Sequence, residues 1–312
     1  MVTLAKNPGN NKPLGLTLVL AIVAVFCLCH GLLAFAADDA ANLRDKYQSL
    51  GQQLKHNQFQ RPIYLESVES PSTIKGDIYA VLDYPYATVS GTLNDPVHGP
   101  ANWCDVLILH LNTKYCHASA SASGNMLSVY IGKKVEQKLA DASRIQFRYR
   151  PVATSPGYFQ VDLTADSGPL STKDYRIVLE AASIDANRTF LHLTYSYGYG
   201  MAGRLAMKTY LATIGSGKVG FTTTGGSSSA QPDYIGGVRG LVERNTMRYY
   251  LAIDAYLGSL SSTSDKRLQQ RLTTWFDATE QYPRQLHELD RQDYLQMKYK
   301  EYERQQTEQP SP

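Results

Sequence analysis

The segment LVERNTMRYYLAIDAYLGSL, residues 241–260, is the strongest helix signal in the chain, and the fold prediction depends on it. Its less polar residues recur at helical spacing, so that Val242, Thr246, Tyr249 and Ile253 share one face. The segment follows a long run of predicted strands. A long amphipathic helix after such a run predicts an α+β fold in which the helix packs against the sheet.

The strands are predicted from short apolar runs, many alternating with polar residues, separated by turn sequences. Eight are expected, at 61–70, 72–85, 115–121, 125–134, 144–152, 157–165, 174–184 and 188–200. Their spacing is typical of an antiparallel sheet. Further helices are expected at 38–55, 86–96, 100–112 and 201–215, and two more in the tail, outside the main core. For 100–112 the alternative is a buried strand.

The N-terminus predicts export. Residues 14–36 contain no Asp, Glu, Lys or Arg, and Lys6 and Lys12 precede them. The small-residue triplet at 34–36 fits a secretory signal that is cleaved near Ala37. We therefore expect a periplasmic or secreted protein. The alternative is an uncleaved anchor, through which residues 14–36 would attach the protein to a membrane.

Removing the signal segment changes the charge and the cysteine count. The formal net charge falls from +3 to +1, which leaves no large basic field and argues against nucleic acid as a partner. Only Cys104 and Cys116 remain, and in an exported protein they predict a disulfide. His110 and His117 could complete a metal site, but structural zinc sites pair ligands two to four residues apart. We expect no metal and no cofactor.

Several residues then suggest a family resemblance. Pro at the end of a strand, a helix with Val and then Leu and Asp, and a later Trp stand here as Pro85, Val89, Leu93, Asp95 and Trp103. With the order of elements over residues 72–260, they resemble the START-like, helix-grip superfamily. Ser90 departs from the pattern, since an aromatic residue often follows the Val. The resemblance implies a curved antiparallel sheet around the last long helix, with a cavity between them.

The resulting domain prediction has four parts. Residues 1–36 are the signal peptide, 37–60 an N-terminal helix, 61–260 the START-like domain and 261–312 a C-terminal helical extension.

The candidate ligand-binding residues come from the long helix, from the last strand and from the resemblance. They are Trp103, His192, Tyr195, Tyr197, Arg244, Arg248 and Tyr249. Arg244 and Arg248 lie one helical turn apart and could hold a ligand carboxylate or phosphate. The alternative is that they pair with Glu243 or with solvent.

The last strand places Tyr195 and Tyr197 on one face and His192 on the other. The tyrosines could line a cavity or simply pack across strands. Motifs for nucleophilic catalysis are absent, and residues 214–220 only superficially resemble a nucleotide-binding loop.

These features predict a protein that sequesters a hydrophobic or amphipathic small molecule, such as a lipid, between sheet and helix. One alternative is a cyclase-like or dehydratase-like enzyme of the same fold. The other is an envelope protein whose tail, residues 261–312, docks a protein partner.

Overall fold

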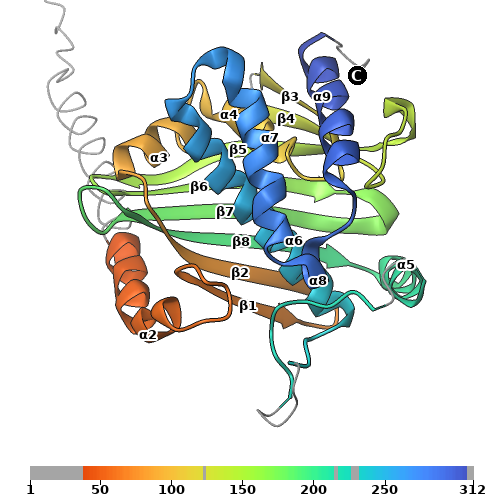
Figure 1. The fold of residues 1–312 in the computed structure, drawn as a ribbon, viewed down its shortest axis with the longest axis horizontal. Coiled ribbons are helices and arrows are strands. Elements are labelled where there is room, and N and C mark those ends of the chain that lie inside the picture. Colours follow the sequence, from red (N-terminus) through yellow and green to blue (C-terminus); the bar gives the residue numbers. More distant parts are fainter. Residues whose placement is uncertain (1–37, 122–123, 214–216, 226–231, 308–312) are drawn as a thin grey trace, which may run out of the picture.

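The computed structural model describes residues 38–121, 124–213, 217–225 and 232–307. Its central element is an eight-stranded sheet whose neighbouring strands are all antiparallel, in the spatial order β1-β2-β8-β7-β6-β5-β4-β3 (Figure 1). The strands are β1 (Ile63–Glu69), β2 (Thr73–Leu82), β3 (Thr113–Ser121), β4 (Gly124–Ile131), β5 (Ser143–Ser155), β6 (Tyr158–Ser167), β7 (Thr172–Ser183) and β8 (Thr189–Tyr199). The eight predicted strands are confirmed.

Helices cover both faces of this sheet. Residues 38–49 are helical and continue, after a turn, into α2 (Gly51–Lys55). The α-helices that follow are α3 (Tyr86–Leu93), α4 (Gly99–Leu107), α5 (Met201–Ala212), α6 (Gly237–Gly258), α7 (Ser264–Glu280), α8 (Pro283–Leu286) and α9 (Arg291–Thr307). The helix expected at 100–112 is therefore a helix and not a strand, but it ends at Leu107.

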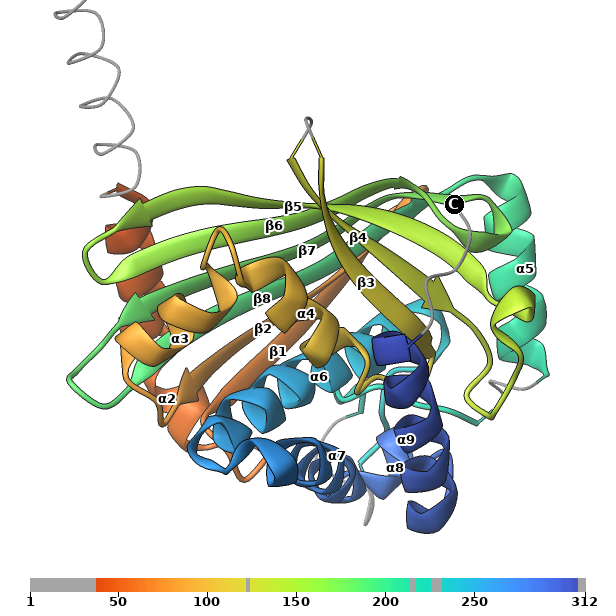
Figure 2. The ribbon, with the colours of Figure 1, turned by 90° about the horizontal axis from the view of Figure 1, so that it is seen from above.

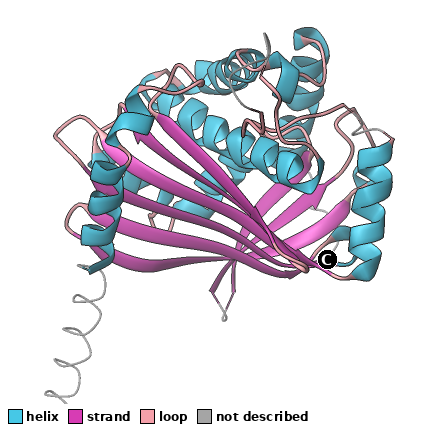
Figure 3. Cartoon of the chain, turned by 90° about the horizontal axis from the view of Figure 1, so that it is seen from below, coloured by secondary structure: helices cyan, strands magenta, loops and turns pink. Residues whose placement is uncertain are grey.

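The long helix α6 lies along the concave face of the curved sheet, where it packs mainly against β2, β1 and β8 (Figure 2). Contact is closest at Gly76 of β2, because a Cβ atom there would collide with the Thr246 hydroxyl on α6. The antiparallel sheet and the helix it encloses confirm the predicted α+β helix-grip fold. Figure 3 shows most of the other helices gathered on the same side of the sheet.

The opposite face of the sheet carries a second, smaller core. Strand β2 shows the division, since Ile78 and Ala80 belong to the main core while Tyr79 and Val81 belong to the second. The N-terminal helix segments cover this face with the buried leucines Leu43, Leu50 and Leu54. Successive strand residues point to opposite faces, so one strand serves both cores.

The predicted disulfide is present between Cys104 of α4 and Cys116 of β3, whose Cα atoms are 5.2 Å apart. The chain turns back between the helix and the strand, which brings two residues twelve positions apart into bonding range. The disulfide therefore joins α4 covalently to the edge strand β3.

The sequence suggested that the C-terminal helices lie outside the main core. In the structure they are part of it. Trp275 of α7 and Tyr294 of α9 are almost fully buried and belong to the same hydrophobic cluster as α6. Their rings stack on one another at a centroid distance of 5.0 Å. Because α7 packs on α6 and α9 packs on β3, the segment completes the core and is not a detached extension.

The predicted signal segment, residues 1–36, lies outside the described residues. Of the helices that the structure describes, none is both long enough and apolar enough to cross a bilayer.

Candidate functional site

A small cavity lies between the concave face of the sheet and α6, with a volume of about 90 Å³. Its walls come from the connection between α4 and β3, from residues of the five strands β3, β4, β5, β7 and β8, and from α6. Most of the lining is apolar, with Val129, Ile145, Phe147 and Ile177 supplied by β4, β5 and β7. Polar groups gather at the other side, where the chain leaves α4.

His110 is the central polar group of this cavity. Its Nδ1 accepts a hydrogen bond from the backbone N–H of Asn112 at 3.2 Å, so in the neutral ring the hydrogen is on Nε2. Burial, together with the charges of Arg248, Lys298 and Lys134, holds the pKa of His110 well below its usual range. The ring is therefore neutral, and its Nε2–H is a hydrogen-bond donor.

The His110 donor has no acceptor of normal geometry within the described residues, although Asn245 of α6 lies near the ring. The hydroxyl of Thr113, which also lines the cavity, lacks a partner among the same residues. Both side chains are almost completely buried. Because buried polar groups are normally hydrogen-bonded, two of them beside one cavity indicate a place for a ligand oxygen or a water molecule.

Two tyrosines form the aromatic side of the cavity. The ring of Tyr249 on α6 stacks on His110 at 4.9 Å, and Tyr195 on β8 meets Tyr249 edge-on at 5.2 Å. Burial raises the pKa values of Tyr195 and Tyr249, so both phenols keep their protons and remain able to hydrogen-bond. Of the predicted ligand-binding residues, these two are the pair that the fold brings to the cavity.

Trp103 and Tyr197 lie on the same side of the sheet but do not line the cavity. The indole of Trp103 donates to the carbonyl oxygen of Leu93 at 3.1 Å and so joins α4 to α3. Tyr197 stacks on Tyr175 at 5.2 Å. Both are packing residues in this structure.

Arg244 and Arg248 are buried but lie on a different side of α6 from the cavity. Arg244 donates to the carbonyl oxygen of Val219 at 3.0 Å. Arg248 donates to the carbonyl oxygen of Leu286 at 3.2 Å and forms an ion pair with Glu288 at 2.8 Å. The carboxylate that meets Arg248 therefore belongs to the chain itself.

His192 lies on the opposite face of the sheet, away from the cavity. Its Nε2 is 3.0 Å from Asp77 and its Nδ1 is 2.7 Å from Glu180, while the ring stacks on Tyr79 at 4.1 Å. Burial opposes protonation, but hydrogen bonds to Asp77 and Glu180 outweigh it and raise the pKa of His192. His192 therefore belongs to a cluster of charged side chains on the outer face of the sheet.

The sequence suggested His110 only as a candidate metal ligand, and neither Thr113 nor Asn245 was among the predicted ligand-binding residues. Metal binding by the group Cys104, His110, Cys116 and His117 is wrong, because the disulfide consumes both thiolates. In the described part of the chain, no group of three His, Cys, Asp or Glu side chains is arranged to hold a metal ion. The available signal was a polar His-Leu-Asn-Thr turn directly after an apolar helix.

The chain was compared with known proteins. No family model matches it, and no curated protein matches. Among solved structures, it is similar to the Zhui aromatase/cyclase from Streptomyces sp. R1128, with 13% identity, 44% of this chain and 70% of that chain covered, and a TM-score of 0.28. It is also similar to norcoclaurine synthase from Thalictrum flavum, in complex with dopamine and hydroxybenzaldehyde, with 9% identity, 48% and 82% coverage, and a TM-score of 0.32.

A START superfamily protein from Mycobacterium smegmatis is similar at 10% identity, with 46% of this chain and 91% of that chain covered and a TM-score of 0.29. The fold assignment itself rests on the sheet topology and on the helix that the sheet encloses. The chain has a helix-grip fold, in which an antiparallel sheet curves around a long helix.

Proposed function

We propose that the protein binds a small, mainly apolar molecule carrying a hydrogen-bond acceptor oxygen in the cavity between the sheet and α6. The observation that supports this most directly is a pair of buried groups, His110 Nε2–H and Thr113 Oγ1, which have no hydrogen-bond partner of normal geometry among the described residues and lie beside a mainly apolar cavity. An apolar body gains free energy by leaving water, and one or two polar contacts fix its orientation.

The size and charge of the cavity narrow the ligand class. About 90 Å³ is less than the roughly 150 Å³ apolar cavity that accepts benzene, so the ligand must be smaller than a six-membered ring, and a short chain of a few atoms is the largest good fit. A lipid would require the cavity to widen. Because the neutral His110 ring offers one N–H donor and lies in a field of positive charges, it favours an electron-rich oxygen acceptor, such as a carbonyl oxygen.

The test compares acetone with isobutene, which has nearly the same shape but no acceptor oxygen. Binding is followed through the methyl resonances of Leu107 and Ile131, both of which line the cavity. We expect the ketone to bind about tenfold more tightly, because the hydrocarbon leaves the Nε2–H donor buried and unpaired. The variant His110→Phe should lose this preference.

The matched control is His117→Phe, since His117 does not line the cavity. It should leave both affinities unchanged. Equal affinity for the two probes in the unaltered protein would contradict the proposed role of His110. Failure of both probes to bind at millimolar concentration would contradict a ligand site in this cavity.

We further propose that the protein acts after export. The uncharged segment 14–36 and the disulfide between Cys104 and Cys116 support this, because disulfides persist in oxidising compartments. N-terminal sequencing of the exported protein should begin at or near Ala37, and a chain that still begins at Met1 would contradict cleavage.

A further inference from the structure

The two edge strands of the sheet, β3 and β1, differ in how they are protected from pairing with a further strand. Helix α9 covers the β3 edge, where Lys298 donates to the carbonyl oxygen of Thr113 at 2.8 Å, and the strand register there shifts between Thr113 and Tyr115. The other edge, β1, has a regular register and contains no Lys or Pro. The charged residues of β1 are Glu66 and Glu69. Natural proteins usually protect long edge strands by several such devices, so an edge with few of them suggests a use.

The hydrogen-bond pattern identifies which backbone groups β1 presents outward. Val81 N–H bonds to the carbonyl oxygen of Pro62, and Ser70 N–H bonds to that of Thr73. In an antiparallel pair bonded residues alternate with non-bonded ones, so Leu65 and Ser67 direct their N–H and C=O groups away from β2. No backbone hydrogen bond between described residues uses these four groups.

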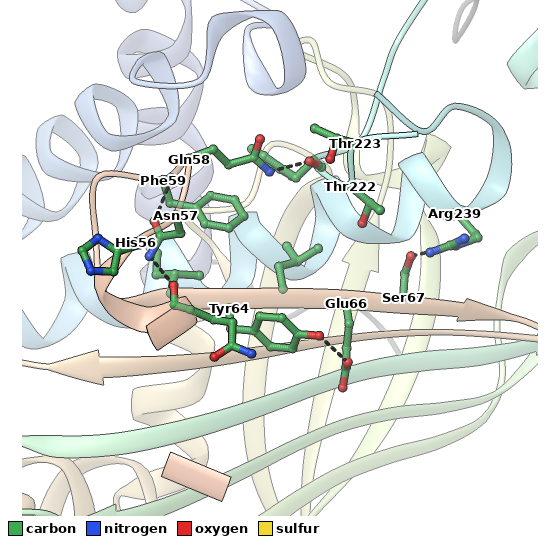
Figure 4. Close-up of a pocket in the computed structure, with 14 residues that line it drawn as sticks. His56, Asn57, Gln58, Phe59, Tyr64, Glu66, Ser67, Thr222, Thr223 and Arg239 are labelled. Atoms are coloured by element: carbon green, nitrogen blue, oxygen red, sulfur yellow. Dashed lines mark hydrogen bonds between the residues drawn. The ribbon is translucent and has the colours of Figure 1, made fainter. Parts of the chain in front are cut away.

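A groove of about 590 Å³ runs along this edge (Figure 4). One wall is formed by residues 63–67 of β1, and the facing walls are formed by residues 56–59 and 221–223. The close-up shows Phe59 and Thr222 on the side facing Tyr64 and Ser67. The groove therefore offers an open strand edge on one side and a mixed apolar and polar wall on the other.

The buried carboxylate of Glu243 bonds to both walls of the groove and so fixes the distance between them. Glu243 of α6 accepts hydrogen bonds from Ser67 Oγ at 2.6 Å, from Phe221 N–H at 2.6 Å and from Thr222 N–H at 2.9 Å. Gln58 is tied to the same wall through the carbonyl oxygen of Phe221. A preformed groove costs less ordering free energy when it binds a ligand.

Arg239 gives the groove a charge preference. Its Nε donates to Ser67 Oγ at 3.0 Å, and among the described residues it has no carboxylate partner (Figure 4). A guanidinium with unused donors beside an open strand end is complementary to a carboxylate.

We propose that this groove binds an extended segment of another protein as an added strand beside β1, with an acidic side chain of that segment at Arg239. Backbone hydrogen bonds to Leu65 and Ser67 supply the pairing, and the Arg239 contact sets the register. A second copy of this chain fits less well, because its own 56–59 and 221–223 segments would meet the same edge. The groove and the cavity share no lining residue, so peptide binding is independent of the cavity ligand.

The probe is a fluorescent acetylated and amidated peptide, Val-Thr-Val-Asp-Val-Thr, whose binding is measured by anisotropy. Two further versions carry N-methyl groups on alternate residues, one set for each parity. Added-strand pairing uses the N–H groups of one parity only, so one version should lose binding and the other should keep it. Replacing Asp by Asn in the peptide should weaken binding about fivefold.

The variant Arg239→Gln should bind the Asp peptide about fivefold more weakly and the Asn peptide with unchanged affinity. The control is Arg150→Gln, an exposed arginine on β5, far along the sheet from β1. Hydrogen exchange should slow at the amides of Leu65 and Ser67 when the peptide is added. Equal binding of both N-methyl versions, slowed exchange confined to other sites, or no binding at millimolar peptide would overturn the proposal.

Discussion

His192 shows how a single side chain stabilises the outer face of the sheet. It lies between Asp77 on β2 and Glu180 on β7, and so links three adjacent strands through one ring. Although burial opposes the charged form of Asp77, the hydrogen bonds from His192, Lys75 and Thr194 lower its pKa to about 2. Below the raised pKa of His192, the cluster carries a protonated imidazole between two carboxylates.

This arrangement predicts a pH-dependent stability. The pKa of folded His192 is raised, so its contribution is complete below the unfolded value of about 6.5 and is lost as the pH rises through the folded value. The contribution of Asp77 is present above the ordinary aspartate pKa of 3.8 and is lost as the pH falls towards 2. Urea unfolding at pH 6 should show His192→Gln destabilised by about 2 kcal/mol, with a smaller difference at pH 9.

The control for this measurement is His117→Gln, since His117 forms no ion pair with a described residue. Its unfolding free energy should differ little from that of the unaltered protein at both pH values. A destabilisation by His192→Gln of the same size at pH 6 and pH 9 would argue against an ionised imidazole.

At the scale of elements, the packing of α6 on the sheet depends on a missing side chain. Gly76 lies opposite Val242 and Thr246 and allows the helix to approach the backbone of β2. Thr246 is β-branched, and its hydroxyl already bonds to the carbonyl oxygen of Val242. Its side chain therefore has little freedom to make room.

We expect Gly76→Ala to destabilise the protein by about 1–3 kcal/mol, because the added methyl group overpacks the contact. Chemical denaturation measures the change. The matched control is Gly51→Ala, since an added Cβ at that position meets no other atom and residue 51 is helical. It should be neutral or slightly stabilising.

Removing the hydroxyl group provides a rescue, because Thr246→Ala combined with Gly76→Ala takes away the atom that the new methyl group meets. The double variant should recover part of the lost stability. A double variant that loses the sum of the two single effects would show that this contact is not the cause.

At the scale of the whole molecule, the C-terminal helices close the fold at the β3 edge. Lys114 of β3 and Lys298 of α9 are fully buried and both bond to Glu301, at 2.9 and 2.7 Å. The hydroxyl of Tyr294 donates to the carbonyl oxygen of Leu109 at 3.0 Å. Because Lys298 also donates to the carbonyl oxygen of His110, α9 helps to position the turn that lines the cavity.

A chain that ends after Ser262 should therefore fail to fold cooperatively. It loses Trp275 and Tyr294 from the core and exposes to water the apolar surfaces of α6 and β3 that α7 and α9 cover. Calorimetry should show no unfolding peak, whereas a chain that ends after Thr307 keeps these contacts and should melt like the full protein. A cooperative transition at unchanged temperature in the shorter chain would show that the tail is a separate extension.

The sequence by itself determined the local elements and the disulfide. Strands and helices follow from residue periodicity, and the pairing of Cys104 with Cys116 was predicted because they are the two cysteines outside the predicted signal segment. The order of these elements was enough to predict the helix-grip fold. The periodicity of a segment does not show which other segments pack against each of its faces.

Only the tertiary structure decided which polar groups meet the cavity. Residue periodicity predicted one apolar face for α6, but the helix is buried on nearly every side. Arg244 and Arg248 therefore bond to backbone carbonyl groups of neighbouring segments, whereas Tyr249 contacts the sheet. His110 reaches the cavity because the chain reverses after α4, and α9 holds that turn in place. These positions depend on contacts between distant segments, which determine where each side chain can be buried.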